Sequence, residues 1–353
     1  MGMHLGPIAE RVDWLFGHAS RHAAEYASPE ATLARQRYQA RHPTAIAVLK
    51  CMDGRINIPV ATGTPPGIIQ PFRNLGGMFD LGWPHLGEVL AHYVHRQIDE
   101  GRRVLVLATY HFSRGDPQRG CAGFNYDTAA ALAATNALRR QIETVFGLGH
   151  RSVYPLICGF ETDEDALILH GENPGEMLDL STVTPADEAL LPARLAALCP
   201  DMPEQMRDDL LPLLTGNLRH IASTRQSVRT LDTEHREWII CLGRGFDFLH
   251  MPNLALIVGP YSPQLADPIG KAAAIIASNM QAGRIPDDGF LLLASSPYEE
   301  IGSDRARAEM KARFLGGFAA QVIGERVPAI ADRMISRTAV LDWRTRRLEL
   351  LAG

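Results

Sequence analysis

The stretch TAIAVLKCMDGR, residues 44–55, decides the predicted fold. Its first half is a short apolar run with β-branched residues, which is typical of a buried strand. A second run of this kind, RRVLVLATYH at 102–111, comes after HLGEVLAHYVHRQIDEG at 85–101, which has helical periodicity and ends at a glycine. Strand, helix and strand in this order predict two parallel strands joined by a crossover helix.

The same alternation continues along the chain. DTAAALAATNALRRQIETVFG at 127–147 predicts a second helix, and SVYPLICGF at 152–160 predicts a third strand. DEDALILHG at 163–171 indicates an edge strand or a turn, and residues 1–44 indicate two short helices. We therefore predict an α/β fold in which a short helical N-terminal segment precedes a sheet domain at 45–184.

The second half contains segments that can be laid, in order, on elements of the first half. EWIICLGRG can be laid on IAVLKCMDGR, GFLLLASS on RVLVLATY, DRARAEMKARFLGGFAAQVIG on the alanine-rich helix, and RTAVLDW on RSVYPLI. This order predicts an internal duplication. A second, related sheet domain is expected at 233–353, after a helical connector at 185–232 that contains several prolines.

The composition predicts a globular protein of two domains, because 46% of the 353 residues are hydrophobic and 21% are charged. Net charge is −5 and no long basic run occurs, so neither nucleic acid nor a membrane surface is an expected partner. No signal peptide or membrane-spanning stretch is recognisable, which predicts a cytoplasmic protein without membrane insertion. The five scattered cysteines are expected to be free thiols or metal ligands.

Three of the side chains that can bind metal are predicted to meet. Cys51 and His111 stand at the ends of predicted neighbouring strands, where functional groups of parallel sheets gather. Cys121 can fold back to them through FSRGDPQRG, because glycine and proline allow tight turns. A Cys₂His set leaves one position of a tetrahedral zinc open, as in a catalytic site. The alternative is two buried apolar thiols and an ordinary hydrogen-bonded histidine.

Asp53 and Arg55 follow Cys51 at the second and fourth positions. On a solvated turn they would form a surface ion pair, which contributes little. Beside a metal, the carboxylate can accept a hydrogen bond or occupy the open coordination position, and the guanidinium can keep the carboxylate ionised and oriented. Both interpretations are open at this point.

Three motifs resemble those of β-class carbonic anhydrases. CMDGR at 51–55 resembles their Cys-x-Asp-x-Arg signature, RNLGG at 73–77 resembles their Arg-Asn-Ala-Gly segment, and the strand ending in His111 before GCAG resembles their third motif. In most of that class two residues separate the histidine from the cysteine, whereas nine do so here. The long loop and the repeated half resemble the carboxysome shell carbonic anhydrases, a divergent branch with a degenerate second copy.

The resemblance implies one zinc ion per chain, held by Cys51, His111 and Cys121, with Asp53 and Arg55 as the catalytic pair. It implies reversible hydration of carbon dioxide to bicarbonate by zinc-bound hydroxide, in a homodimer or larger homo-oligomer, with the carboxysome as a second candidate location. Two alternatives stay open: a zinc hydrolase of an analogue such as carbon disulfide or carbonyl sulfide, and a non-catalytic subunit of this type.

The second copy is expected to lack a metal site. Cys241 aligns with Cys51, but Gly243 stands where Asp53 does, and no cysteine follows Cys241. The second sheet domain is therefore predicted to be a scaffold or a pseudo-twofold partner.

Overall fold

The computed structural model describes residues 3–173, 175–229, 233–249 and 253–352. Residues 230–232, at the end of the predicted connector, lie outside the described residues. The chain divides into two compact units, which we call the first-sheet unit (34–51 and 56–233) and the second-sheet unit (1–33, 52–55 and 234–353). The four residues after Cys51 thus belong to a different unit from the strand that precedes them.

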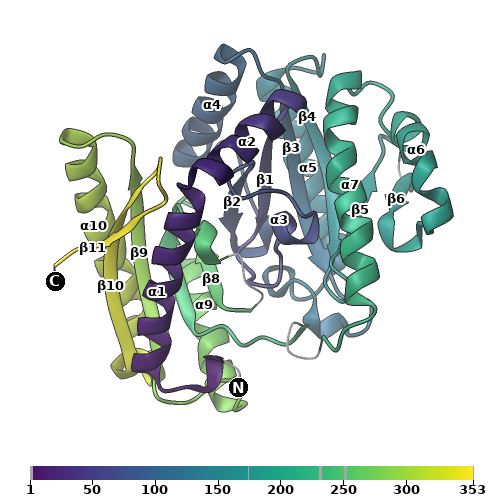
Figure 1. Cartoon of the computed structure of the whole chain (residues 1–353). Coiled ribbons are helices and arrows are strands. Elements are labelled where there is room, and N and C mark those ends of the chain that lie inside the picture. The colour runs from purple at the N-terminus through teal and green to yellow at the C-terminus, as the bar shows by residue number, and fades with distance from the viewer. Residues whose placement is uncertain (1–2, 174, 230–232, 250–252, 353) are drawn as a thin grey trace. The chain divides into compact units, whose positions relative to one another are not determined.

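The first-sheet unit contains six strands in the order β2-β1-β3-β4-β5-β6 (Figure 1). Four of them are parallel: β1 (Ala45–Cys51), β2 (Ile69–Asn74), β3 (Val104–Phe112) and β4 (Val153–Glu161). The last two are antiparallel to their neighbours: β5 (Ala166–His170) and β6 (Met177–Asp179). β1 and β4 are buried along their whole length, which explains their almost uninterrupted apolar sequences. The three predicted strands are confirmed. The segment predicted to be an edge strand or a turn forms β5, which is not at the edge because it pairs with both β4 and β6.

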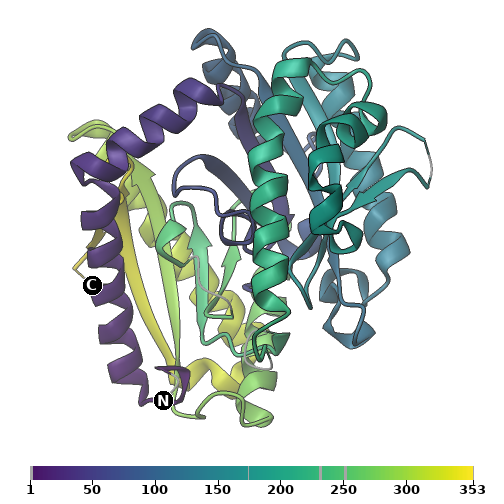
Figure 2. The same cartoon turned by 45° about the vertical axis from the view of Figure 1, so that its right-hand side comes forward.

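Among the described residues of this unit, the α-helices are α2 (Pro29–Arg41), which crosses the unit boundary between residues 33 and 34, α3 (Ile58–Ala61), α4 (Pro84–Asp99), α5 (Thr128–Phe146), α6 (Leu191–Leu198) and α7 (Glu204–Thr224). Its 3₁₀ helices are η2 (Leu75–Gly77), η3 (Pro117–Arg119), η4 (Ala122–Phe124), η5 (Leu180–Thr182) and η6 (Pro185–Leu190). The helices predicted at 85–101 and 127–147 are confirmed as α4 and α5. α5 packs along β3 and β4, and α7 packs along β5 (Figure 2). Asp127 caps α5 by accepting a 3.0 Å hydrogen bond from the Ala130 amide.

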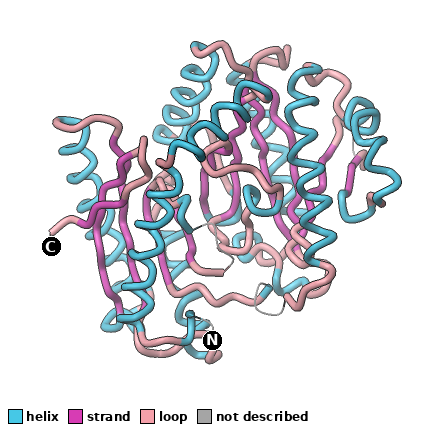
Figure 3. The backbone as a smooth tube through the Cα atoms, viewed as in Figure 1, coloured by secondary structure: helices cyan, strands magenta, loops and turns pink. Residues whose placement is uncertain are grey.

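The second-sheet unit contains five strands in the order β11-β10-β9-β7-β8 (Figure 3). Four are parallel: β7 (Ile239–Gly243), β8 (Ala255–Val258), β9 (Phe290–Tyr298) and β10 (Met334–Asp342), and β11 (Leu348–Leu350) is antiparallel to β10. The helices among its described residues are η1 (Met3–Leu5), α1 (Ile8–Tyr26), η7 (Asp247–Leu249), α9 (Ala266–Gln281), α10 (Ser303–Arg326) and η8 (Pro328–Arg333).

The two sheets share one connectivity. β8-β7-β9-β10 has the same order and direction as β2-β1-β3-β4, and in both sheets an antiparallel strand follows at the same edge. β3 and β9 are both nine residues long. His111 is next to last in β3, and the corresponding position in β9 is occupied by Pro297, which cannot bind a metal through its side chain. Among the described helices, none combines the length and apolar character needed to cross a bilayer.

Candidate metal centre

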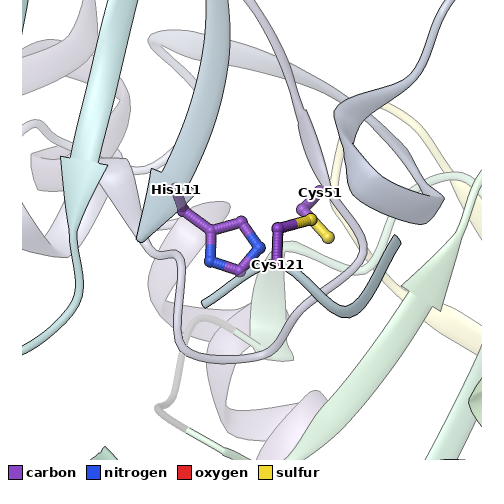
Figure 4. Close-up of side chains that lie close together, drawn as sticks. All are labelled: Cys51, His111 and Cys121. Carbon is purple, nitrogen blue, oxygen red and sulfur yellow. The ribbon is translucent and has the colours of Figure 1, made fainter. Parts of the chain in front are cut away.

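Three donor atoms gather at the carboxyl edge of the first sheet. Cys51 is the last residue of β1, His111 is next to last in β3, and Cys121 directly precedes η4. One atom of each side chain lies within 4.8 Å of the other two, and all three residues are buried. The side chains point toward one another (Figure 4). The predicted meeting of two thiols and one imidazole is thus present in the structure.

Parallel pairing brings the first two donors to one edge. β1 and β3 are paired with Leu49 opposite Ala108. Continuing this register puts Cys51 level with Tyr110, one residue before His111. The sheet itself therefore brings one thiol and the imidazole together, whereas Cys121 depends on the loop that follows β3.

A glycine turn closes the space beside the donors. η2 contains Gly77, which has φ of 67° and would place a Cβ only 2.9 Å from the Thr109 carbonyl oxygen and 3.4 Å from the Cys51 amide nitrogen. A Cβ on Gly123, two residues after Cys121, would lie 2.7 Å from the Gly76 Cα. Only glycine fits these close approaches, so the RNLGG segment packs directly against the backbone that carries the cysteines.

Gly77→Ala is expected to lower the free energy of unfolding by about 2–4 kcal/mol, because it adds a backbone clash to the strain of a positive φ. The matched control is Gly63→Ala, whose φ is 61° but whose Cβ would meet nothing within 4 Å. That change is expected to cost only about 1 kcal/mol of backbone strain. Urea unfolding of both variants measures the difference, and equal losses would contradict the close-packed turn.

The protonation of the three donors depends on whether a cation is bound. Hydrogen bonding to Cys121 and burial together raise the pKa of the Cys51 thiol well above its usual value, while hydrogen bonding to His111 acts in the opposite direction. Two buried thiols side by side therefore do not ionise together without a compensating positive charge. Tetrahedral zinc, with Zn–S bonds of ~2.3 Å and Zn–N bonds of ~2.0 Å, sets its ligand atoms about 3.3–3.8 Å apart. The two sulfurs and one imidazole nitrogen, which lie within 4.8 Å of one another, fit this ion.

Asp53 and Arg55 form a buried ion pair in the second-sheet unit. The Asp53 Oδ1 atom accepts hydrogen bonds from the Arg55 amide at 2.8 Å and from its Nε at 3.1 Å, and Oδ2 accepts one from the guanidinium at 2.6 Å. Asp53 is 7% exposed and Arg55 3%, so the pair is not the solvated turn that was the alternative interpretation. A bidentate guanidinium contact holds a carboxylate in one orientation.

The backbone of this pair is attached to the β8 edge of the second sheet. The Met52 carbonyl accepts a hydrogen bond from the Ile257 amide at 3.1 Å, and the Gly54 carbonyl accepts one from the Asn253 amide at 3.4 Å. A Cβ on Gly54 would lie 2.8 Å from the Ala255 carbonyl oxygen, so the segment has no room for a larger residue. The second sheet therefore supports Asp53 and Arg55.

Two further residues lie beside Asp53 and were not singled out from the sequence. His235 and Glu237 each offer a ligand-type atom within 4.8 Å of one on Asp53. Glu237 is fully buried, and the His235 Nδ1 lies 3.0 Å from both of its carboxylate oxygens. Burial acts to raise the pKa of Glu237, but the imidazole outweighs it and the pKa is lowered. In the sequence, the only local sign of these two residues is a glutamate directly before the apolar run WIICLG.

The other cysteines lie outside the donor group. Cys158, Cys199 and Cys241 are buried and form no disulfide. Burial raises the pKa of Cys158 to about 12 and that of Cys199 to about 11, so both stay protonated at neutral pH. Their behaviour is that of small apolar side chains.

Comparison with known proteins places the donors in a known type of domain. Residues 44–188 match the sequence model described as Carboxysome Shell Carbonic Anhydrase, catalytic domain. This segment includes the three donors as well as Asp53 and Arg55.

Curated relatives show the same likeness. The chain is 28% identical over 245 residues to the carboxysome shell carbonic anhydrase of Hydrogenovibrio crunogenus, covering 60% of this chain and 46% of the relative. It is 30% identical over 260 residues to that of Halothiobacillus neapolitanus, covering 60% of this chain and 49% of the relative. The chain thus spans about half the length of the curated relatives it matches. The family resemblance read from the motifs is confirmed: residues 44–188 are similar to the catalytic domain of the carboxysome shell carbonic anhydrases, a divergent β-class branch.

Proposed function

We propose that the chain is a zinc-dependent carbonic anhydrase that hydrates carbon dioxide reversibly to bicarbonate. The observation that carries the proposal is the buried donor set of Cys51, His111 and Cys121, within the segment similar to a carbonic anhydrase catalytic domain. We assign these residues as the ligands of one zinc ion per chain. Two thiolates and one imidazole leave a coordination position open, which is the composition of a catalytic zinc site.

Zinc in such a donor set supplies a Lewis acid that activates water near neutral pH. The chain's own contribution is the ion pair that follows Cys51. Three hydrogen bonds from Arg55 favour the ionised form of Asp53 and set its orientation. We assign Asp53 the role of accepting a hydrogen bond from the reacting water and Arg55 the role of orienting Asp53.

Stopped-flow measurement of carbon dioxide hydration, with zinc content determined on the same purified protein, tests the proposal. We expect activity with about one zinc per chain, lost on chelation and restored by added zinc. Zinc-loaded protein without hydration activity would favour the non-catalytic subunit. Turnover of carbon disulfide or carbonyl sulfide without carbon dioxide hydration would favour the analogue hydrolase.

We also propose that the chain works in association with the carboxysome, within the cytoplasm. What supports this is the name of its relatives, which are carboxysome shell carbonic anhydrases. Cell fractionation tests the location: the chain is expected to sediment with carboxysome shells, and recovery entirely in the shell-free fraction would contradict it.

We propose that the two sheets arose by internal duplication, and the shared strand order supports this. In this view an N-terminal segment at 1–44 precedes the zinc-bearing domain at 45–184, and a connector at 185–232 leads to a domain at 233–353 without a metal site.

We further propose a homodimer or larger homo-oligomer, because β-class enzymes use paired units. Light scattering of the purified protein measures the oligomeric state.

A further inference from the structure

The position of Cys121 depends on the loop at 112–120, which separates it from His111. Five of these nine residues lie outside any strand or helix, because β3 ends at Phe112 and η3 covers only Pro117–Arg119. Such a loop can order a metal ligand only if its backbone is held by other groups. The acidic turn after β4, GFETDED in the sequence, supplies these groups.

Glu161, the last residue of β4, reaches the start of the loop. It pairs with Phe112 in the sheet and is fully buried. Its carboxyl oxygens accept hydrogen bonds from the amides of Arg114 at 3.2 Å, Asp163 at 3.0 Å and Glu164 at 3.0 Å. One buried side chain thus joins the loop to the turn that follows β4.

Asp163 holds the next two residues of the loop. Its carboxylate accepts a 2.9 Å hydrogen bond from the Ser113 hydroxyl and a 2.7 Å bond from the Gly115 amide. The Ser113 oxygen in turn accepts the Asp116 amide at 3.1 Å. The amides of residues 114, 115 and 116 are therefore all bound by Glu161, by Asp163 or by the hydroxyl that Asp163 orients.

The pKa values of the two carboxyl groups are shifted in opposite directions. Burial raises the pKa of Glu161 to about 7, and the side-chain hydrogen bond with Asp163 acts in the same direction, whereas the hydrogen bonds from the Asp163 and Glu164 amides act to lower it. For Asp163 burial acts to raise the pKa, but the hydrogen bonds from Gly115, Glu161 and Ser113 outweigh it, so the pKa is lowered. Asp163 is thus the ionised acceptor, and charge-assisted bonds to an amide and a hydroxyl are stronger than neutral ones.

The backbone of the remaining residues before Cys121 is held by local hydrogen bonds. The Asp116 side chain accepts the Gln118 amide at 2.9 Å, and the Gly120 amide donates to the Pro117 carbonyl at 2.9 Å. These bonds form one compact turn between the anchored amides and the sulfur. Fixing residues 113–116 therefore fixes where Cys121 lies.

We propose that Glu161 and Asp163 are a positioning pair that anchors the loop at 113–120 and so places Cys121 against Cys51 and His111. The inference rests on the proposed metal site and deepens it. Nine residues separate Cys121 from His111, and the two carboxyl groups at the end of the neighbouring strand restrain the loop that they form. Neither carboxyl group belongs to the donor group, and the pair acts through the loop.

Cobalt binding to the full chain tests the pair, because thiolate-to-cobalt absorption reports the number of sulfur ligands. Asp163→Asn and Glu161→Ala are expected to weaken cobalt affinity by at least about tenfold and to reduce the thiolate absorption. Glu161→Gln keeps a neutral acceptor for the Arg114 amide and is expected to stay close to the unmodified protein. The matched control is Glu164→Gln, in the same turn, whose carboxylate binds Arg225.

Amide hydrogen exchange of the metal-free protein gives an independent measurement. Asp163→Asn is expected to speed exchange at residues 114–116 while strands β3 and β4 remain protected. Unchanged cobalt affinity, unchanged absorption and unchanged exchange in Asp163→Asn and Glu161→Ala would overturn the inference. If the unmodified chain shows no thiolate absorption with cobalt, the metal site fails instead, and exchange at 114–116 still decides whether the pair anchors the loop.

Discussion

Cys121→Ser is expected to lose bound zinc and carbon dioxide hydration together. A serine hydroxyl is a far weaker zinc ligand than a thiolate, and with only two strong donors left, zinc content should fall below about a tenth of an ion per chain after dialysis. Elemental analysis and stopped-flow hydration on the same sample give both values. Cys121 is 3% exposed and contributes little to any strand, so the fold should persist in circular dichroism.

The matched control for this change is Cys241→Ser. Cys241 is a fully buried thiol in β7, the strand that corresponds to β1, and it belongs to no metal-ligand group among the described residues. This variant is expected to retain its zinc. Full zinc retention in Cys121→Ser would remove Cys121 from the ligand set.

Asp53→Asn is expected to retain zinc and lose at least about a hundredfold in kcat, the range typical of a group that exchanges a proton or a strong hydrogen bond with the reacting water. Asparagine has nearly the same shape and can still accept a hydrogen bond from Arg55, so the segment at 52–55 should stay on the second sheet. Zinc content and the hydration rate at saturating carbon dioxide measure the two expectations.

The matched control for Asp53→Asn is Asp247→Asn, which separates a loss of kcat from a loss of stability. Asp247 and Arg346 also form a buried ion pair in the second-sheet unit, with a shortest distance of 3.4 Å. Removal of this charge should cost stability without a comparable loss of kcat per folded molecule. If Asp53→Asn turns over as fast as the unmodified protein, Asp53 has no part in the reaction.

Much of the fold is predictable from local sequence. β1, β3 and β4 are buried and apolar almost throughout, and the lengths of α4 and α5 follow from helical periodicity and a final glycine or cap. The sequence does not predict β2, because IQPFRN contains a proline and polar residues that are atypical of a parallel strand. It lies at the edge of the sheet and pairs only with β1, where a missing amide donor is tolerated.

Two donors of the candidate metal centre were predictable because the strands that carry them were predictable. Cys51 and His111 end neighbouring parallel strands, and strand ends meet at one edge of a sheet. The groups around the site were not predictable. The acidic turn containing Glu161 and Asp163 has the composition of a solvated loop, yet the Glu161 side chain is fully buried. Likewise, no pattern along the chain relates His235 to Asp53.

The sequence by itself determined the strands, the three donors and the order in which they occur, because apolar runs and strand ends are properties of neighbouring residues. Only the tertiary structure decided that residues 52–55 attach to the second sheet, that Glu237 lies beside Asp53, and that Glu161 and Asp163 hold the loop before Cys121. These contacts join residues far apart in the chain, and their free energy depends on burial and hydrogen-bond geometry that no local pattern encodes.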